Sequence, residues 1–233
     1  MGRERMNGSA GDSGSGGGGR GRRGRYVVGI TGASGALYAQ RTVRVLLGLG
    51  HEVHLVVTSY GKRLLRDELG AAVLGSEGGL DLRVFAGLGS GEEPRERGLF
   101  VHPSKDVGAS LGSGSFRHDG MIVIPCSSNT LGQVASGAGD QLLTRAAAVC
   151  LKERFPLVLV HREAPLNRVD LRNMLELHDA GACIMPANPG FYLGPGSVMD
   201  LVDFVVARSL DQLGVEHEVS SRWSQELADR STH

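Results

Sequence analysis

The chain has 233 residues, and its 25 basic and 25 acidic side chains give a formal net charge of zero at pH 7. This balance provides no basic field for nucleic acid, and no apolar run reaches the length of a membrane span, so we expect neither partner. The three cysteines, Cys126, Cys150 and Cys183, lie far apart in apolar segments. They indicate reduced, buried thiols in a cytoplasmic protein rather than disulfides or a metal site.

Composition divides the chain into three parts. Residues 1–25 contain ten glycines and six arginines, which predicts a disordered arm. Residues 26–223 form the expected globular domain, which is long enough to bury a core without the help of disulfides. Residues 224–233 form a polar tail.

Within the domain, short apolar runs alternate with amphipathic segments. The apolar runs predict strands at 26–30, 52–58, 120–125, 156–160 and 182–186. The amphipathic segments predict helices at 35–47, 61–69, 130–137, 141–153, 167–180 and 197–213. Residues 75–104 are rich in glycine and charge, and we expect a surface excursion there around a short strand near Leu82–Phe85. Strands that alternate with helices predict right-handed crossovers and a three-layer αβα sandwich with a mostly parallel sheet.

Small polar or charged residues follow four of the predicted strands. These segments are Thr31-Gly-Ala-Ser-Gly35, Thr58-Ser59, Ser127-Ser-Asn-Thr130 and Arg162-Glu163. In open α/β sheets this edge is where ligands bind, and amides and hydroxyls at helix N-termini suit the phosphate of a mononucleotide. Tight turns, helix N-caps and solvated loop charges without a ligand are the alternative, since one hydroxyl is enough for a cap.

Four further residues have a functional and a plain interpretation. Arg145 and Lys152 lie seven residues apart on one face of a predicted helix, where they suit either an anion or the solvated side of an amphipathic helix. Tyr192 follows a Pro-Gly loop, where a lone tyrosine is usually a packing anchor. Arg208 stands in the last predicted helix, where a lone arginine is usually a surface charge.

A series of short motifs stands in order along the chain. These are Gly29-Ile-Thr-Gly-Ala-Ser-Gly35, Ser113-Gly-Ser-Phe116, Pro125-Cys-Ser-Ser-Asn-Thr-Leu131, Leu142-Leu-Thr-Arg145, Leu151-Lys-Glu-Arg154, Arg162-Glu163, Met185-Pro-Ala187 with Phe191-Tyr192, and Arg208. Their order and spacing resemble the UbiX-type flavin prenyltransferases of the flavoprotein decarboxylase-like superfamily. The resemblance covers about residues 26–223, and it is specific because many separate motifs agree.

The resemblance implies a flavodoxin-like, Rossmann-like three-layer fold in a homo-oligomer, usually a homododecamer. It implies transfer of a dimethylallyl group from dimethylallyl phosphate to N5 and C6 of reduced FMN. The product, prenylated FMN, serves UbiD-type decarboxylases, so such an enzyme is the implied recipient. The family needs no metal to ionise the donor, and the chain has no aspartate-rich Mg²⁺ motif.

Position by position, the resemblance assigns one set of residues to the flavin. The FMN-binding residues that it implies are Gly32, Ala33, Ser34, Thr58, Ser127, Ser128, Asn129, Thr130 and Arg162. Thr58 stands where the family commonly has Ser, and this change preserves the hydroxyl.

The other assigned residues concern the prenyl donor and the chemistry. Tyr192, Arg208 and Lys152 would hold the donor phosphate, because fixed cations stabilise a leaving phosphate without reorganisation. Glu163 would move protons as phosphate leaves and the new ring closes. The catalytic residues that the resemblance implies are Glu163, Lys152, Ser34, Glu68 and Arg145.

Three positions depart from the family pattern. Ala148 stands in place of the usual Asp, Phe155 in place of a basic residue, and Ala164 in place of the Thr that normally follows the Arg-Glu pair. None of the three removes a residue that is assigned to a reactant. The missing acid at position 148 is expected to affect packing, assembly or the pKa of nearby cations.

Two other functions stay open from the sequence. One is an FMN-dependent decarboxylase of the same superfamily, which needs a catalytic histidine beside the flavin. His54, His161 and His178 are the residues considered for this role, and none fits it well. The other is a non-catalytic flavin carrier, which has no need for residues that bind a prenyl phosphate.

Overall fold

The computed structural model describes residues 22–75 and 79–219. Its centre is one parallel sheet with the strand order β3-β2-β1-β4-β5-β6. The strands are β1 (Arg25–Ile30), β2 (Glu52–Val57), β3 (Leu99–His102), β4 (Gly120–Cys126), β5 (Leu157–His161) and β6 (Cys183–Pro186). Five of the six were predicted from their apolar runs. The predicted arm at 1–21, and the end of the domain and the tail from 220 onward, lie outside the described residues.

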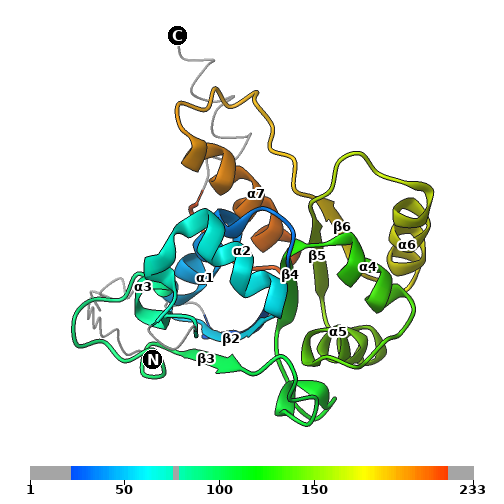
Figure 1. Ribbon diagram of the computed structural model, residues 1–233, viewed down its shortest axis with the longest axis horizontal. Helices are drawn as coiled ribbons and strands as arrows, with labels where there is room; N and C mark the ends of the chain where they lie inside the picture. The colour runs from blue at the N-terminus through cyan, green and yellow to red at the C-terminus, as the bar shows by residue number, and fades with distance from the viewer. Residues whose placement is uncertain (1–21, 76–78, 220–233) are drawn as a thin grey trace, which may run out of the picture.

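Helices cover both faces of the sheet, as predicted (Figure 1). One face is packed by α1 (Ala36–Gly48), α2 (Ser59–Leu69), α3 (Leu82–Ala86) and α7 (Val198–Gln212), and the other by α4 (Ser128–Ala135), α5 (Leu142–Glu153) and α6 (Arg168–Asp179). Each face has its own cluster of buried aliphatic residues, which accounts for the nearly uninterrupted apolar character of β1, β4 and β5. None of the described helices combines the length and apolarity needed to cross a membrane.

The excursion at residues 75–104 differs from the prediction. Leu82–Phe85, predicted as a strand, belongs to helix α3, because Asp81 caps its start and Gly87 ends it in the left-handed conformation with φ 68°. The Asp81 carboxylate accepts from the amides of Arg83 and Val84 at 3.0 and 3.1 Å. The missed strand is β3, a four-residue edge strand paired only with β2. The strand β1 also begins one residue before the predicted domain, at Arg25.

The two edges of the sheet have different roles. We call the edge where the strands begin the amino edge, and the edge where they end the carboxyl edge. The strands β1 and β4 are neighbours, and the helices that follow them, α1 and α4, cover opposite faces of the sheet. The order in which strands are added to the sheet therefore reverses between β1 and β4. In doubly wound sheets the crevice at this switch point, on the carboxyl edge, is the usual ligand site.

Candidate active site

The turn after β1 forms the centre of the carboxyl edge. A side chain at Gly32 would bring a Cβ within 2.6 Å of Tyr60 Cβ, and Gly35 has φ 130°, so this turn requires both glycines. The Thr31 hydroxyl donates to the Pro125 carbonyl at 2.7 Å and accepts from the Ser127 amide at 2.9 Å. The turns after β1 and β4 are therefore tied together, as the predicted binding of one ligand by both requires.

Glu68, one of the catalytic residues that the resemblance implies, lies against the first turn. Its carboxylate accepts from the amides of Gly35 and Ala36 at 3.0 and 2.8 Å. These are N–H groups at the N-terminus of α1, where a negative charge is stabilised by the helix dipole. Glu68 thus occupies the position that the sequence pattern offered to a phosphate, and a ligand phosphate is expected at the neighbouring turns.

The hydroxyls after β2 and β4 act first as helix caps. Thr58 accepts from the Gly61 amide at 3.0 Å, and Ser127 accepts from the Thr130 amide at 3.3 Å. The capping alternative is therefore correct for these two residues, although a capping oxygen has a second lone pair for a ligand. Ser128 does not cap α4; its hydroxyl lies 3.0 Å from His161 Nε2.

Arg162 carries an unusual buried group. Its backbone amide donates to the Cys126 carbonyl at 3.1 Å, which fixes the residue beside the end of β4. Its side-chain Nε is buried and has no hydrogen-bond partner within the described part of the chain. An unpartnered buried N–H costs free energy, so this guanidinium indicates a missing acceptor. The next residue, Glu163, is exposed, and its Oε1 accepts from the Ala164 amide at 3.1 Å.

Cys126 ends β4 directly before the Ser127–Thr130 turn. It is fully buried, and burial raises the pKa of its thiol to about 12. All three cysteines are free thiols; Cys126 and Cys150 are buried, as predicted, whereas Cys183 is only partly buried. Cys126 therefore contributes packing to the site rather than a nucleophile.

The residues assigned to the prenyl donor are spread over one chain. Lys152 is the last residue but one of α5, and its Nζ pairs with Glu153 Oε1 at 2.5 Å. The strand β5 follows, and at 3.3 Å per residue its length separates Lys152 from Arg162 by roughly 17 Å. Arg208 pairs with Asp211 at 2.9 Å, near the end of α7. This end lies at the amino edge, because the next turn's Gln212 accepts from Cys183, the first residue of β6.

Arg145 and Tyr192 lie closer to the ligand edge, but on different sides of the molecule. Arg145, in the first turn of α5, donates from Nε to the Gly112 carbonyl at 3.2 Å. Tyr192 is about half exposed in the segment between β6 and α7, and its ring meets Phe204 edge-on at 5.8 Å between centroids. The chain therefore brings together the flavin-assigned residues with Glu68 and Glu163, but it does not bring Lys152 and Arg208 to them.

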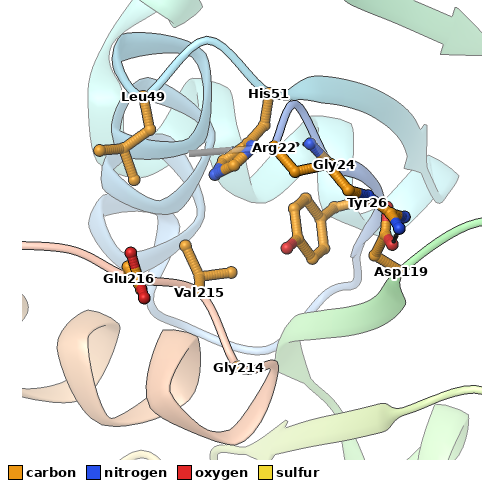
Figure 2. A pocket seen from close by; sticks show the side chains of 9 residues that line it. All are labelled: Arg22, Gly24, Tyr26, Leu49, His51, Asp119, Gly214, Val215 and Glu216. Carbon is orange, nitrogen blue, oxygen red and sulfur yellow. Dashed lines mark hydrogen bonds and ion pairs between the residues drawn. The ribbon is translucent and has the colours of Figure 1, made fainter. Parts of the chain in front are cut away.

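Hollows lie at both edges of the sheet in the described part of the chain. A groove of about 670 Å³ between α4 and α6 adjoins the candidate site and is lined by Ser128 and Asn129 among others. A cavity of about 510 Å³ lies at the amino edge, where His51 and Tyr26 face Val215 and Glu216 (Figure 2). None of the residues assigned from the sequence lines this second cavity.

Comparison with known proteins decides the family. The flavoprotein family model matches residues 19–210. The flavin prenyltransferase UbiX of Halalkalibacterium halodurans is 46% identical over 84% of this chain and 91% of its own length. The UbiX of Deinococcus radiodurans is also 46% identical, over 82% of this chain and 89% of its own length. The chain belongs to the UbiX-type flavin prenyltransferases.

Solved structures of UbiX-type proteins share the fold. AnUbiX (PadA1), solved with FMN and dimethylallyl pyrophosphate, is 40% identical with a TM-score of 0.74, over 87% of this chain and 98% of its own. A dodecameric FMN-dependent UbiX-like decarboxylase from Escherichia coli O157:H7 is 41% identical with a TM-score of 0.71, over 83% and 96%.

The residues at the carboxyl edge fit FMN. The buried Nε of Arg162 needs an acceptor, and the flavin and its phosphate carry several. The sequence offers His161 only as a poorly fitting catalytic histidine of a decarboxylase, whereas the structure shows it buried and hydrogen-bonded to Ser128.

Proposed function

We propose that this protein is a flavin prenyltransferase that moves a dimethylallyl group from dimethylallyl phosphate to N5 and C6 of reduced FMN. The observation that carries the proposal is the buried, unpartnered Arg162 Nε between hydroxyl-rich turns, in a chain 46% identical to named flavin prenyltransferases. We further propose that the prenylated FMN passes to a UbiD-type decarboxylase. The free thiols support a place in the reducing cytoplasm.

The roles proposed for the residues follow from their positions. The turn at 31–35 and the segment 127–130 would bind and orient the flavin, which supplies the nucleophilic N5 and C6 when reduced. The Arg162 guanidinium would donate to the flavin from its buried Nε, and a charge-assisted hydrogen bond of this kind is stronger than a neutral one. Glu163, exposed at the same edge, would take the proton that leaves C6 on ring closure.

Glu68 receives a different role from the one first expected. The resemblance suggested a catalytic acid, but its carboxylate is held by two amides of α1. Both amides are backbone groups of the turn and of the start of α1, so the carboxylate is engaged in holding the backbone. We therefore assign Glu68 to fixing the shape of the first turn around Ser34.

We propose that Lys152 and Arg208 reach the site from neighbouring copies in a homo-oligomer, which we take to be a dodecamer. Within one chain both lie near the amino edge. The E. coli relative is dodecameric. Exposed apolar side chains, including Leu171 and Leu175 on α6 and Phe191 beside Tyr192, provide surface for contacts between copies.

The activity is tested by anaerobic incubation with reduced FMN and dimethylallyl phosphate, followed by mass analysis of the released flavin. A gain of one C5H8 unit is expected. Unchanged flavin, from protein that is folded and binds FMN, would refute the proposal and favour the flavin-carrier alternative. Loss of CO₂ from an added thiol-containing acid, without prenylation, would favour the decarboxylase.

Sharing of sites between copies has its own test. Lys152→Ala and Glu163→Gln are each expected to be nearly inactive. If one site takes these residues from different chains, an assembly mixed at random from both variants has about a quarter of its sites intact. Recovered prenyl transfer in the co-expressed mixture supports the proposal. A mixture as inactive as its parents would show that both residues act from one chain.

A further inference from the structure

His161 is a buried imidazole between the candidate site and the α4–α6 layer. It is the last residue of β5 and is 3% exposed. Its backbone is held on both sides, because it pairs in register with Cys126 of β4 and its carbonyl accepts from the Ala187 amide at 2.8 Å. The position of the ring is therefore set by the sheet rather than by a mobile loop.

The ring holds one hydroxyl. His161 Nε2 lies 3.0 Å from Ser128 Oγ. Ser128 is the first residue of α4, and the cap of that helix is supplied by its neighbour Ser127. The Ser128 hydroxyl thus has no capping role, and it also lines the groove beside the flavin-assigned turn. A serine hydroxyl rotates freely unless a partner fixes it, and the imidazole is that partner.

Burial favours the neutral form of the His161 ring. Burial lowers the pKa of His161, with a smaller opposing effect from Asp170 and Glu163. In a neutral imidazole, Nε2 is either a donor or an acceptor. The Ser128 hydroxyl must take the complementary role toward Nε2, and its remaining proton or lone pairs then point in one fixed direction. Such preorganisation removes the cost of ordering the hydroxyl when a ligand arrives.

We infer that His161 is a positioning residue that orients the Ser128 hydroxyl toward bound FMN and sets flavin affinity through it. The inference rests on the proposed function only in placing FMN at the carboxyl edge. It differs from a packing role for His161, in which the ring fills space and any loss on substitution appears in folding stability instead of flavin affinity.

The experiment is a double-mutant cycle with four variants: Ser128→Ala, His161→Leu, the double variant, and His161→Gln, whose amide nitrogen takes a position near that of Nε2. FMN dissociation constants are measured by flavin fluorescence, and thermal unfolding is recorded without FMN. We expect each of Ser128→Ala and His161→Leu to weaken FMN binding about tenfold, the double variant to be no weaker than either, and His161→Gln to stay within about threefold of the parent.

Three outcomes would overturn the inference: losses that multiply in the double variant, unchanged affinity in His161→Leu, or a His161→Gln variant as weak as His161→Leu. Failure of the proposed function is separate, since it appears as absent prenyl transfer in a parent protein that still binds FMN. A folding defect in His161→Leu alone does not decide the outcome, because His161→Gln and Ser128→Ala carry the same prediction.

Discussion

The two edges of the sheet both carry charged residues and both adjoin a hollow, but their charged groups differ in the partners that the chain provides. At the amino edge Arg22 pairs with Asp119 at 2.5 Å, Arg25 pairs with Glu52, and the Gly24 amide donates to His51 at 3.0 Å. At the carboxyl edge a buried guanidinium nitrogen has no partner in the described chain. The size of a hollow does not separate the two regions. Near the amino edge the buried Nδ1 of His118, two residues before β4, also has no partner among the described residues. The carboxyl edge differs because its unpartnered nitrogen belongs to a guanidinium, which always carries a donor proton and cannot become an acceptor.

The largest difference is expected from matched carboxylates, one at each edge. Glu163→Gln keeps the size of the side chain and removes its proton-accepting charge, so prenyl transfer should fall about a hundredfold or more. Glu216→Gln, in the amino-edge cavity, should leave transfer unchanged. Anaerobic single-turnover spectra measure both, and FMN binding should persist in each. Equal effects of the two substitutions would remove the functional distinction between the edges.

Two arginines provide the next comparison. Arg208→Ala removes a cation proposed to hold the donor phosphate, which should cost roughly 1.5–3 kcal/mol, or about ten- to over a hundredfold in donor binding or ionisation. Titration with dimethylallyl phosphate at saturating FMN measures this loss. Its control is Arg63→Ala on α2, whose arginine pairs with Asp67 one turn away, as Arg208 pairs with Asp211. A deficit of similar size in the control would point to general charge effects.

Two histidines on the strands β2 and β3, away from the candidate site, should make stability depend on pH. Burial lowers the pKa of His54 and of His102, whose rings are joined at 2.9 Å between nitrogens, although Glu52 acts in the opposite direction on His54. The unfolded chain then binds more protons below pH about 6.5, so stability is complete above that pH and falls as the pH drops further. Urea midpoints at pH 7.5 and 5.5 measure the loss. His102→Gln should flatten this dependence, and an unchanged slope would contradict the assignment.

The smallest effect is expected from the exposed pair at the amino edge. Arg22→Gln removes an ion pair whose arginine is 83% exposed, and such pairs contribute no more than about 1 kcal/mol. Thermal unfolding should shift little, and FMN affinity should not change. A loss of FMN affinity would show that the two edges are coupled.

The fold was largely predictable because its signal is local. Apolar runs marked five strands, and the alternation with helices required a parallel sheet. The missed strand, β3, is only four residues long, and its Val101 is exposed at the edge of the sheet, so no buried pattern marks it. The prediction of a strand near Leu82–Phe85 was wrong because it was based on the apolar residues of this segment. Asp81 and Gly87, which are the N-cap and C-cap of α3, are the residues that indicate a helix there.

The candidate site was predictable in part. Hydroxyls and charges at strand ends could be read from the sequence, since a parallel sheet gathers its carboxyl ends at one edge. The contact of Glu68 with the first turn and that of His161 with Ser128 join residues more than thirty positions apart. They depend on how helices pack on the sheet, and no spacing along the chain encodes them. The separation of Lys152 from Glu163, by contrast, already follows from the predicted helix at 141–153 and the predicted strand at 156–160.

The burial of Cys126 has a chemical consequence for a protein that is proposed to handle an allylic electrophile. A cysteine side by side with the reacting groups would normally compete for the prenyl unit and end as a dead thioether. With its pKa raised to about 12, only about one thiol in 10⁵ is ionised at pH 7, and the thiolate is the form that is alkylated. Cys126 can therefore lie beside the candidate site without being alkylated by the prenyl donor.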